Sequence, residues 1–297
     1  MNPSLWDQMM TWLDIYWLQP DLVAVSVGLA VAFGAIWLCA HWPSLRNPRF
    51  IAVALVSAFL TMLAINYIQT PLQERISDAL TSSYSNQTIY DWFLLMGIPS
   101  LAVSGLVQEG AKMVPMVFWW WRKGKYLSPA MGLTIGAVAG AAFGIYEGFW
   151  VFTRVFGSGW TTEYISAMGF IGIASFWERF FAIGFHIAVS ALAGWGLAKG
   201  KGWQFYLLAS GLHLLFNYPV LIYTKGMLDI TQIETIIAVY TVIVAAVVLW
   251  IRWTRDNSGV HIDFLPEDDA WDEDEEDDLL PDTVDETGEG PDTAEAE

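Results

Sequence analysis

The sequence predicts an all-α membrane protein, a polytopic bundle of about seven transmembrane helices followed by a disordered acidic C-terminal tail. The 297 residues are 55% apolar and include 17 tryptophans, more than an ordinary soluble surface accommodates. Several apolar runs reach the roughly 20 residues that a helix needs to cross the ~30 Å hydrocarbon core. We therefore expect an interfacial segment at 1–20, a transmembrane domain at 21–255 and a cytoplasmic tail at 256–297.

The charge of the chain is concentrated in the tail. Residues 256–297 hold 19 of the 31 acidic residues and no Lys or Arg, which leaves 12 acidic against 14 basic residues elsewhere. The tail has too little apolar content to fold, so we expect it to be solvated or to dock on a basic partner. At the other end, residues 4–18 place Leu, Met, Trp and Tyr at helical spacing, which is typical of an amphipathic helix on the outer interface or of a packed cap.

The N-terminus and the single cysteine narrow the class of protein further. The N-terminus lacks a basic region and a small-residue cleavage site, so we expect the first span itself to direct membrane insertion. Cys39 is the only cysteine and lies in an apolar run. A disulfide framework and a cysteine zinc site are therefore both excluded.

Seven apolar runs qualify as spans, and the basic residues support that number. The stretch 164–177 is too short to cross and is interpreted as an interfacial extension of the fifth helix. Short cytoplasmic loops carry the excess of Lys and Arg, and here nine basic residues fall in one set of loops and three in the opposite set. We expect a prokaryotic cytoplasmic membrane, with the N-terminus outside and the tail in the cytoplasm. The predicted spans are 22–41, 50–69, 93–121, 129–153, 178–198, 203–224 and 234–252.

The third predicted helix carries the motif QEGAK at 108–112, near the middle of its apolar stretch. A charge at the bilayer centre costs roughly 2.5 to 3.5 kcal/mol on insertion scales, so a charged residue at this depth indicates function. Glu109 and Lys112 are three residues apart and share one helix face. We expect them to form an ion pair that offsets part of the desolvation cost.

The fourth, fifth and sixth predicted helices carry further polar groups. Glu147 on the fourth helix follows Phe143 by one turn and lies beside glycines at every fourth position from 132 to 148, a pattern that favours close approach of another helix. Arg179 and His186 lie two turns apart on the fifth helix. His213 and Asn217 are one turn apart on the sixth.

These groups are predicted to meet at similar depth. Glu109, His186 and His213 fall near the midplane, with Glu147 and Asn217 about 5 to 8 Å toward the outer side at the helical rise of 1.5 Å per residue. Carboxylates, imidazoles and an amide can activate water, protonate a leaving group and bind an oxyanion. They can also form a proton relay or a metal site built from Glu and His.

The order of these motifs resembles the PrsW-type intramembrane proteases, distant relatives of the CAAX prenyl endopeptidases. That family's pattern is E-E-x-x-K, F-x-x-x-E, an Arg followed by a His, and a His with an Asn one turn later. The matching segments are QEGAK at 108–112, FGIYE at 143–147, Arg179 with His186, and HLLFN at 213–217. The resemblance covers roughly residues 92–224.

The resemblance implies an endopeptidase that cuts a membrane-anchored protein within the lipid bilayer, with no nucleic-acid partner. It implies Glu109, Glu147, His186, His213 and Asn217 as site residues, supported by Gln108, Lys112, Phe143 and Arg179. We expect Glu109 or Glu147 to work with a histidine on the water while Asn217 stabilises the oxyanion and Lys112 orients Glu109. We expect no cofactor, with zinc as the alternative; a metal-dependent version would use Glu109, Glu147, His186 and His213.

One position departs from the family pattern. Gln108 stands where the pattern has its first Glu, and an amide is not a general base. The chain is then either a pseudoprotease that acts as a membrane scaffold, or it uses Glu109 or Glu147 instead. A proton-coupled transporter is a further alternative, although no internal repeat is evident between the halves of the chain.

Overall fold

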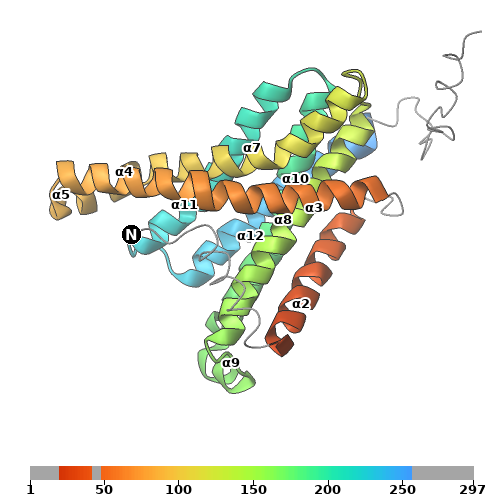
Figure 1. The fold of residues 1–297 in the computed structure, drawn as a ribbon. Coiled ribbons are helices and arrows are strands. Elements are labelled where there is room, and N and C mark those ends of the chain that lie inside the picture. Colours follow the sequence, from red (N-terminus) through yellow and green to blue (C-terminus); the bar gives the residue numbers. More distant parts are fainter. Residues whose placement is uncertain (1–19, 42–47, 256–297) are drawn as a thin grey trace, which may run out of the picture. The chain divides into compact units, whose positions relative to one another are not determined.

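The computed structural model describes residues 20–41 and 48–255 (Figure 1). These residues contain helices and connecting segments but no strand, and seven helical stretches are long and apolar enough to cross a membrane. The predicted fold class and the predicted number of spans are confirmed, and the chain is an integral membrane protein. The predicted interfacial helix at 4–18 and the acidic tail at 256–297 lie outside the described residues.

The seven stretches are built from long helices, and short helices lie in two of the connections. The long ones are α2 (Pro20–Cys39), α3 (Pro48–Ala64) with the π-helix η1 (Ile65–Gln69) and α4 (Thr70–Ser83), α7 (Ile98–Arg122), α8 (Pro129–Gly157), α10 (Ala174–Ala198), α11 (Gly202–Thr224) and α12 (Ile230–Trp250) with the π-helix η3 (Ile251–Arg255). The short ones are α5 (Asn86–Asp91), α6 (Phe93–Met96), α9 (Thr162–Met168) and the 3₁₀-helix η2 (Gly169–Ile173).

The largest departures from the predicted bounds are in the second span and in the segment before the fifth. The second span was predicted to end at residue 69, but the helix continues to Ser83 as the polar helix α4, none of whose residues is buried. The π-helical turn η1 ends two residues before Pro71, whose ring would clash with the preceding turn of a regular α-helix. The predicted extension of the fifth helix at 164–177 is interrupted at Gly169, whose φ of 58° ends α9.

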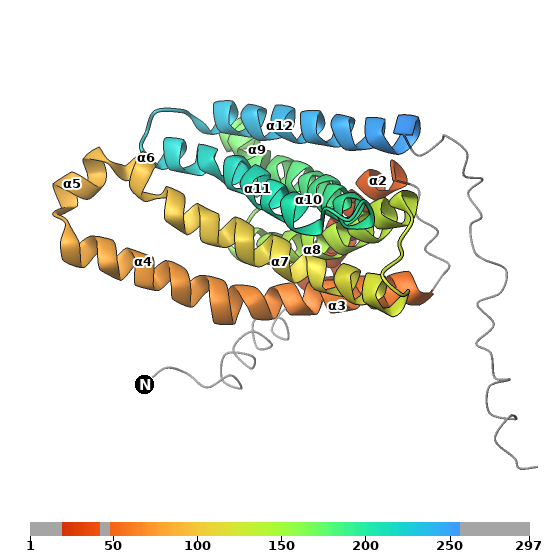
Figure 2. The same ribbon diagram turned by 90° about the horizontal axis from the view of Figure 1, so that it is seen from above.

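Helices α8 and α10 form the interior of the bundle. In their most apolar windows 61% and 83% of the residues are buried, against 22% for the spans that contain α2, α3 and α7. Figure 2 shows α8 and α10 between α12 on one side and α3 on the other. Helix α2 packs on α8 and α10, while α7 and α11 pack on each other and on α10. Side chains that these interior helices share are therefore shielded from lipid and water.

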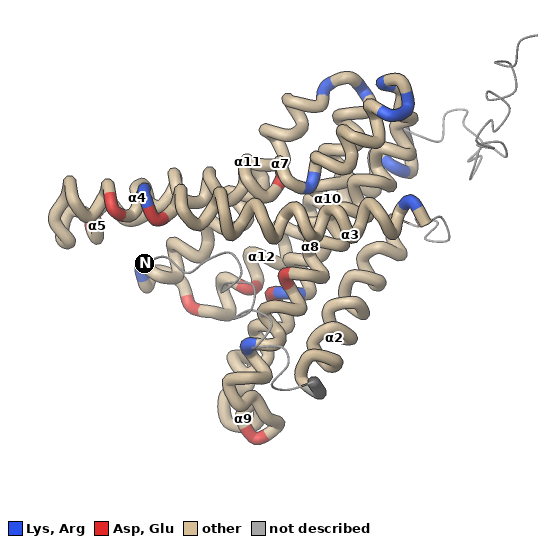
Figure 3. The backbone as a smooth tube through the Cα atoms, in the orientation of Figure 1, with Lys and Arg blue, Asp and Glu red and all other residues tan. Residues whose placement is uncertain are grey.

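Basic residues gather at one end of the described bundle. Figure 3 shows Lys and Arg where α3 begins and where α7 is joined to α8, while the acidic positions lie elsewhere along the helices. Arg122 ends α7, the α7–α8 connection contains Lys123 and Lys125, and the α10–α11 connection contains Lys199 and Lys201.

A row of glycines on α8 brings its backbone against that of α10, as the spacing of four predicted. A Cβ atom at Gly136 would overlap the carbonyl oxygen of Ser190, and one at Gly140 would overlap the carbonyl oxygen of His186. At Gly144 a Cβ would lie 3.1 Å from the Cα of Ile183. The two helices therefore cross with no room for a side chain between them, which fixes the position of His186 relative to α8.

We predict that Gly140→Ala lowers the free energy of unfolding by about 1 to 3 kcal/mol, because the added methyl group forces the two backbones apart. Gly157→Ala is the matched control on the same helix, since nothing lies within 4 Å of a Cβ there. Unfolding of both variants in detergent micelles provides the measurement. Equal stability of the two variants would contradict the proposed role of the close approach.

Candidate active site

Helix α7 contributes a fully buried ion pair. The ammonium of Lys112 donates to Oε1 of Glu109 over 2.6 Å, and the side chains are 0% and 1% exposed. The two residues lie one turn apart on one face of α7, so the pair predicted from their spacing is confirmed. Each charge would be costly in this interior without the other.

Two carboxylate–histidine pairs lie in contact with this ion pair, and Glu109 belongs to one of them. Nδ1 of His213 on α11 lies 2.7 Å from Oε1 of Glu109, and Nε2 of His186 on α10 lies 3.3 Å from Oε2 of Glu147 on α8. The two imidazole rings are tilted against each other with their centroids 5.2 Å apart. Four helices therefore meet here, each with one of these side chains.

Lys112 connects the two pairs. Its ammonium lies 3.2 Å from Nδ1 of His186, and because an ammonium only donates, that ring nitrogen is the acceptor. A neutral His186 then carries its proton on Nε2 and donates it to Glu147. For His213 the assignment is the opposite, because Nδ1–H donates to the Glu109 carboxylate and Nε2 retains its lone pair.

A second cation holds the other carboxylate. Arg179, near the start of α10, donates to Oε2 of Glu147 over 2.6 Å and also pairs with its neighbour Glu178. Phe143 forms one wall, with its ring edge-to-face to His186 at 4.6 Å and with the Lys112 ammonium 5.0 Å from its centroid. The predicted supporting residues Lys112, Phe143 and Arg179 therefore all contact this group.

Two predicted residues are not brought into the charged group. Gln108 donates instead to Gln69 and to Ser104, on the side of α7 that faces the α3–η1–α4 helix. Asn217 lies half-buried one turn after His213, and its side chain has no hydrogen bond within the described part of the chain.

Two participants were not identified from the sequence. Glu178 had a visible signal, because it is a second charge directly beside Arg179 in an apolar context. The contact of Gln69 with Gln108 joins residues 39 positions apart, and no local pattern could indicate it.

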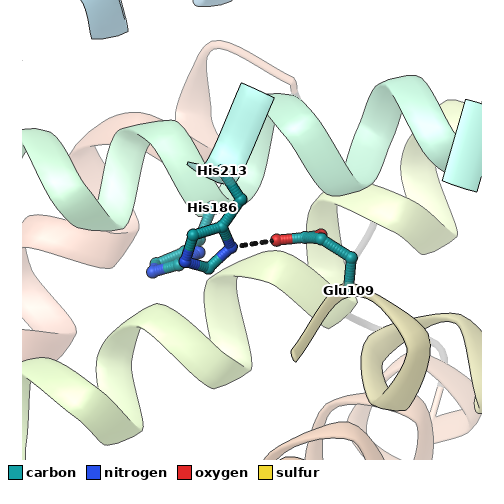
Figure 4. A group of neighbouring side chains, drawn as sticks. All are labelled: Glu109, His186 and His213. Carbon is teal, nitrogen blue, oxygen red and sulfur yellow. Dashed lines mark hydrogen bonds and ion pairs between the residues drawn. The ribbon is translucent and has the colours of Figure 1, made fainter. Parts of the chain in front are cut away.

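Three of these side chains form a possible metal site. One ligand atom from each of Glu109, His186 and His213 lies within 4.8 Å of the others, and all three residues are buried (Figure 4). Two imidazoles and a carboxylate are a common ligand set of catalytic zinc, whose ligands lie about 3.4 Å apart around the ion. His186 also donates its remaining N–H to Glu147, a carboxylate outside the ligand set, as metal-bound histidines usually do, whereas Nδ1–H of His213 donates to the ligand Glu109.

Comparison with known families shows to which family the chain belongs. Residues 47–251 match the PrsW family of intramembrane metalloproteases. The chain belongs to the PrsW family. The match extends beyond the region 92–224 that carries the motifs and includes α3 and α12. Neither the comparison with curated proteins nor the comparison with solved structures gave a match.

PrsW membership implies a protease and, by the family's description, a metal ion. The donor set of this chain fits a single divalent ion in the type and number of its ligands. The ammonium of Lys112 contacts two of the three ligand residues, Glu109 and His186, so it competes with an ion for the same position. A bound ion therefore requires Lys112 to move away from these two atoms.

We predict that Glu109→Gln and Lys112→Met each lower the free energy of unfolding by about 3 to 5 kcal/mol, because each leaves the partner charge buried alone. The double variant should lose much less than the sum, since both charges are then absent. Unfolding in micelles at one pH and one detergent concentration provides the measurement. Additive losses in this double-mutant cycle would show that the two charges are not coupled.

Proposed function

We propose that this PrsW protein is an intramembrane endopeptidase that hydrolyses a peptide bond in a membrane-anchored protein. The observation that carries the proposal is the meeting of Glu109, His186, His213 and Glu147, from four helices, in one hydrogen-bonded group inside the bundle. Ionisable groups are expensive in a membrane interior, and structural hydrogen bonding alone does not require so many of them.

Glu147 is the carboxylate best suited to move a proton. Its side chain is 27% exposed, whereas that of Glu109 is 1% exposed. In the proposed reaction Glu147 takes a proton from water as the water oxygen bonds to the peptide carbon. Glu147 then returns that proton to the amide nitrogen as the carbon–nitrogen bond breaks.

Other residues of the site have binding and orienting roles in this proposal. Arg179 holds Glu147, and Lys112 holds Glu109. The amide of Asn217, which has no hydrogen bond within the described residues, is left to donate to the oxyanion. Glu109, His186 and His213 would hold a divalent ion, which when bound polarises water and a peptide carbonyl.

A metal-free form of the same protease is the second candidate, and Lys112 favours it. The ammonium already neutralises Glu109 and contacts His186, as a bound cation would. In that form the lone pair on Nε2 of His213 and the carboxylate of Glu147 are the groups that accept protons.

The proposed setting is a prokaryotic cytoplasmic membrane with the N-terminus outside and the acidic tail in the cytoplasm. The basic end of the bundle in Figure 3 supports this orientation, because the cytoplasmic side carries the excess of Lys and Arg. A transporter receives no support from PrsW membership. The inactive scaffold predicts no cleavage at all, and cleavage by the purified protein decides against it.

We predict that the purified protein in liposomes cleaves members of a panel of single-span reporter proteins whose spans differ in helix stability. Glu109→Gln, Glu147→Gln, His186→Ala and His213→Ala should each lower the rate by about 10²- to 10⁴-fold, because each removes a proton carrier or a ligand. His41→Gln and Glu74→Gln are the matched controls, since neither side chain belongs to the site. Undiminished cleavage in all four variants would contradict the assignment of these residues to the active site.

We further predict that zinc binds to the wild type at one ion per chain and that chelation abolishes cleavage. His213→Ala should lose the ion, and Lys112→Met should bind it more tightly, because the competing ammonium is gone. Titration with zinc, followed by elemental analysis, measures both effects. Chelator-resistant cleavage without stoichiometric zinc would instead establish the metal-free form.

A further inference from the structure

Three glutamines form a directed chain of hydrogen bonds beside the active site. Nε2 of Gln73 on α4 donates to the carbonyl oxygen of Ser100 on α7 over 2.9 Å. Nε2 of Gln69, the last residue of the π-helix η1, donates to Oε1 of Gln73 over 3.4 Å. Nε2 of Gln108 in turn donates to Oε1 of Gln69 over 3.0 Å and to Ser104 over 3.2 Å. We refer to Gln73, Gln69 and Gln108 as the amide chain.

The direction of the amide chain is fixed at one end. The carbonyl oxygen of Ser100 only accepts, so Gln73 must present its NH₂ group there and its oxygen to Gln69. The same reasoning then orients Gln69 and, after it, Gln108. The NH₂ group of Gln108 therefore donates within the amide chain, and its Oε1 accepts from no residue of that chain.

That oxygen is a buried acceptor without a donor. Gln108 is 5% exposed, and its Oε1 has no hydrogen-bond partner among the described residues. Leaving a buried acceptor unpaired costs on the order of 1 to 3 kcal/mol, so such an atom points to a donor that arrives with a ligand. Gln108 adjoins Glu109 in the sequence and lies one turn before Lys112 on α7, on the face of that turn toward the α3–η1–α4 helix.

The substrate of an intramembrane protease brings donors of this kind. A peptide bond can be cut only where the substrate helix has unwound, and unwinding releases main-chain N–H groups that find no water in the hydrocarbon. Oε1 of Glu109 and Oε2 of Glu147 already accept from Lys112, Arg179 and the histidines. Gln108 Oε1 has no such partner.

We propose that Oε1 of Gln108 accepts a hydrogen bond from a main-chain N–H of the unwound substrate segment, with Gln69 and Gln73 as positioning residues that orient it. This inference rests on the proposed protease function. It also gives the NH₂ group at position 108 a role, donating to Gln69, that the carboxylate of the family pattern cannot fill.

A carboxylate at position 108 conflicts with the amide chain. It has no donor for Oε1 of Gln69, so Gln69 must turn its NH₂ group toward it, and Gln73 must then turn as well. The inversion ends with the Gln73 oxygen facing the Ser100 carbonyl oxygen, two acceptors with no hydrogen between them. Removing the amide of Gln73 relieves this conflict.

The first test measures stability and needs no substrate. Gln108→Glu should shift the unfolding equilibrium toward the unfolded state by about tenfold, and adding Gln73→Ala should recover most of that shift. The control combines Gln108→Glu with Gln87→Ala, which removes an exposed glutamine on α5. This double variant should recover none of the lost stability. An unchanged stability of Gln108→Glu, or equal recovery by the control, would overturn the amide chain as the orienting device.

The second test uses the reporter that the wild type cuts fastest. Gln108→Leu should raise KM, expressed as the mole fraction of reporter in the bilayer, by about two- to tenfold while kcat changes less than twofold. Gln108→Glu should not raise kcat. An unchanged KM in Gln108→Leu, or a higher kcat in Gln108→Glu, overturns this inference alone. If the wild type cuts no reporter, the proposed function falls and the substrate contact falls with it.

Discussion

The ammonium of Lys112 is the contact on which the arrangement of the candidate active site depends. It is fully buried, and it joins Glu109 on its own helix to His186 on α10. Because it can only donate, it fixes which nitrogen of His186 carries the proton and thereby makes that ring a donor to Glu147. Two carboxylate–histidine pairs that would otherwise be independent become one hydrogen-bonded group.

The glycines of α8 make this arrangement possible at the level of packing. An intramembrane site needs its helices close enough for side chains of ordinary length to meet, and lipid supplies no hydrophobic force that brings helices together. Contact between the backbones at Gly136 and Gly140 places His186 directly across from α8. Phe143 and Glu147, one and two turns away from Gly140, then face the same imidazole.

The sequence predicted the parts of this protein that depend on local periodicity. Apolar run lengths predicted the seven spans, and helical spacing predicted the Glu109–Lys112 pair and the glycine contact. It did not predict that the second helix continues beyond residue 69 to Ser83, because α4 mixes polar and apolar residues and carries no continuous apolar run. The interruption at Gly169 was missed because one glycine within an apolar stretch is no proof of a break.

Within the site, the sequence could indicate which residues are polar but not the neighbours they face. Gln108 and Glu109 are adjacent in QEGAK, yet successive residues on a helix point about 100° apart. Glu109 therefore turns to His213, and Gln108 turns to Gln69. That partner is supplied by a different helix, so the direction of Gln108 follows from tertiary packing and not from its motif. The same limit applies to Asn217, which shares a helix face with His213 but joins none of its hydrogen bonds.

A count of charges explains why an amide suits position 108. The hydrogen-bonded group contains three carboxylates, those of Glu109, Glu147 and Glu178, and two cations, Lys112 and Arg179, so with neutral histidines its net charge is −1. A further carboxylate at position 108 would make it −2 in a medium where like charges repel much more strongly than in water. A divalent ion would change the charge from −1 to +1 and weaken the need for Lys112. The neutral amide chain and the competing ammonium therefore follow from the same constraint: a membrane interior tolerates only a small net charge.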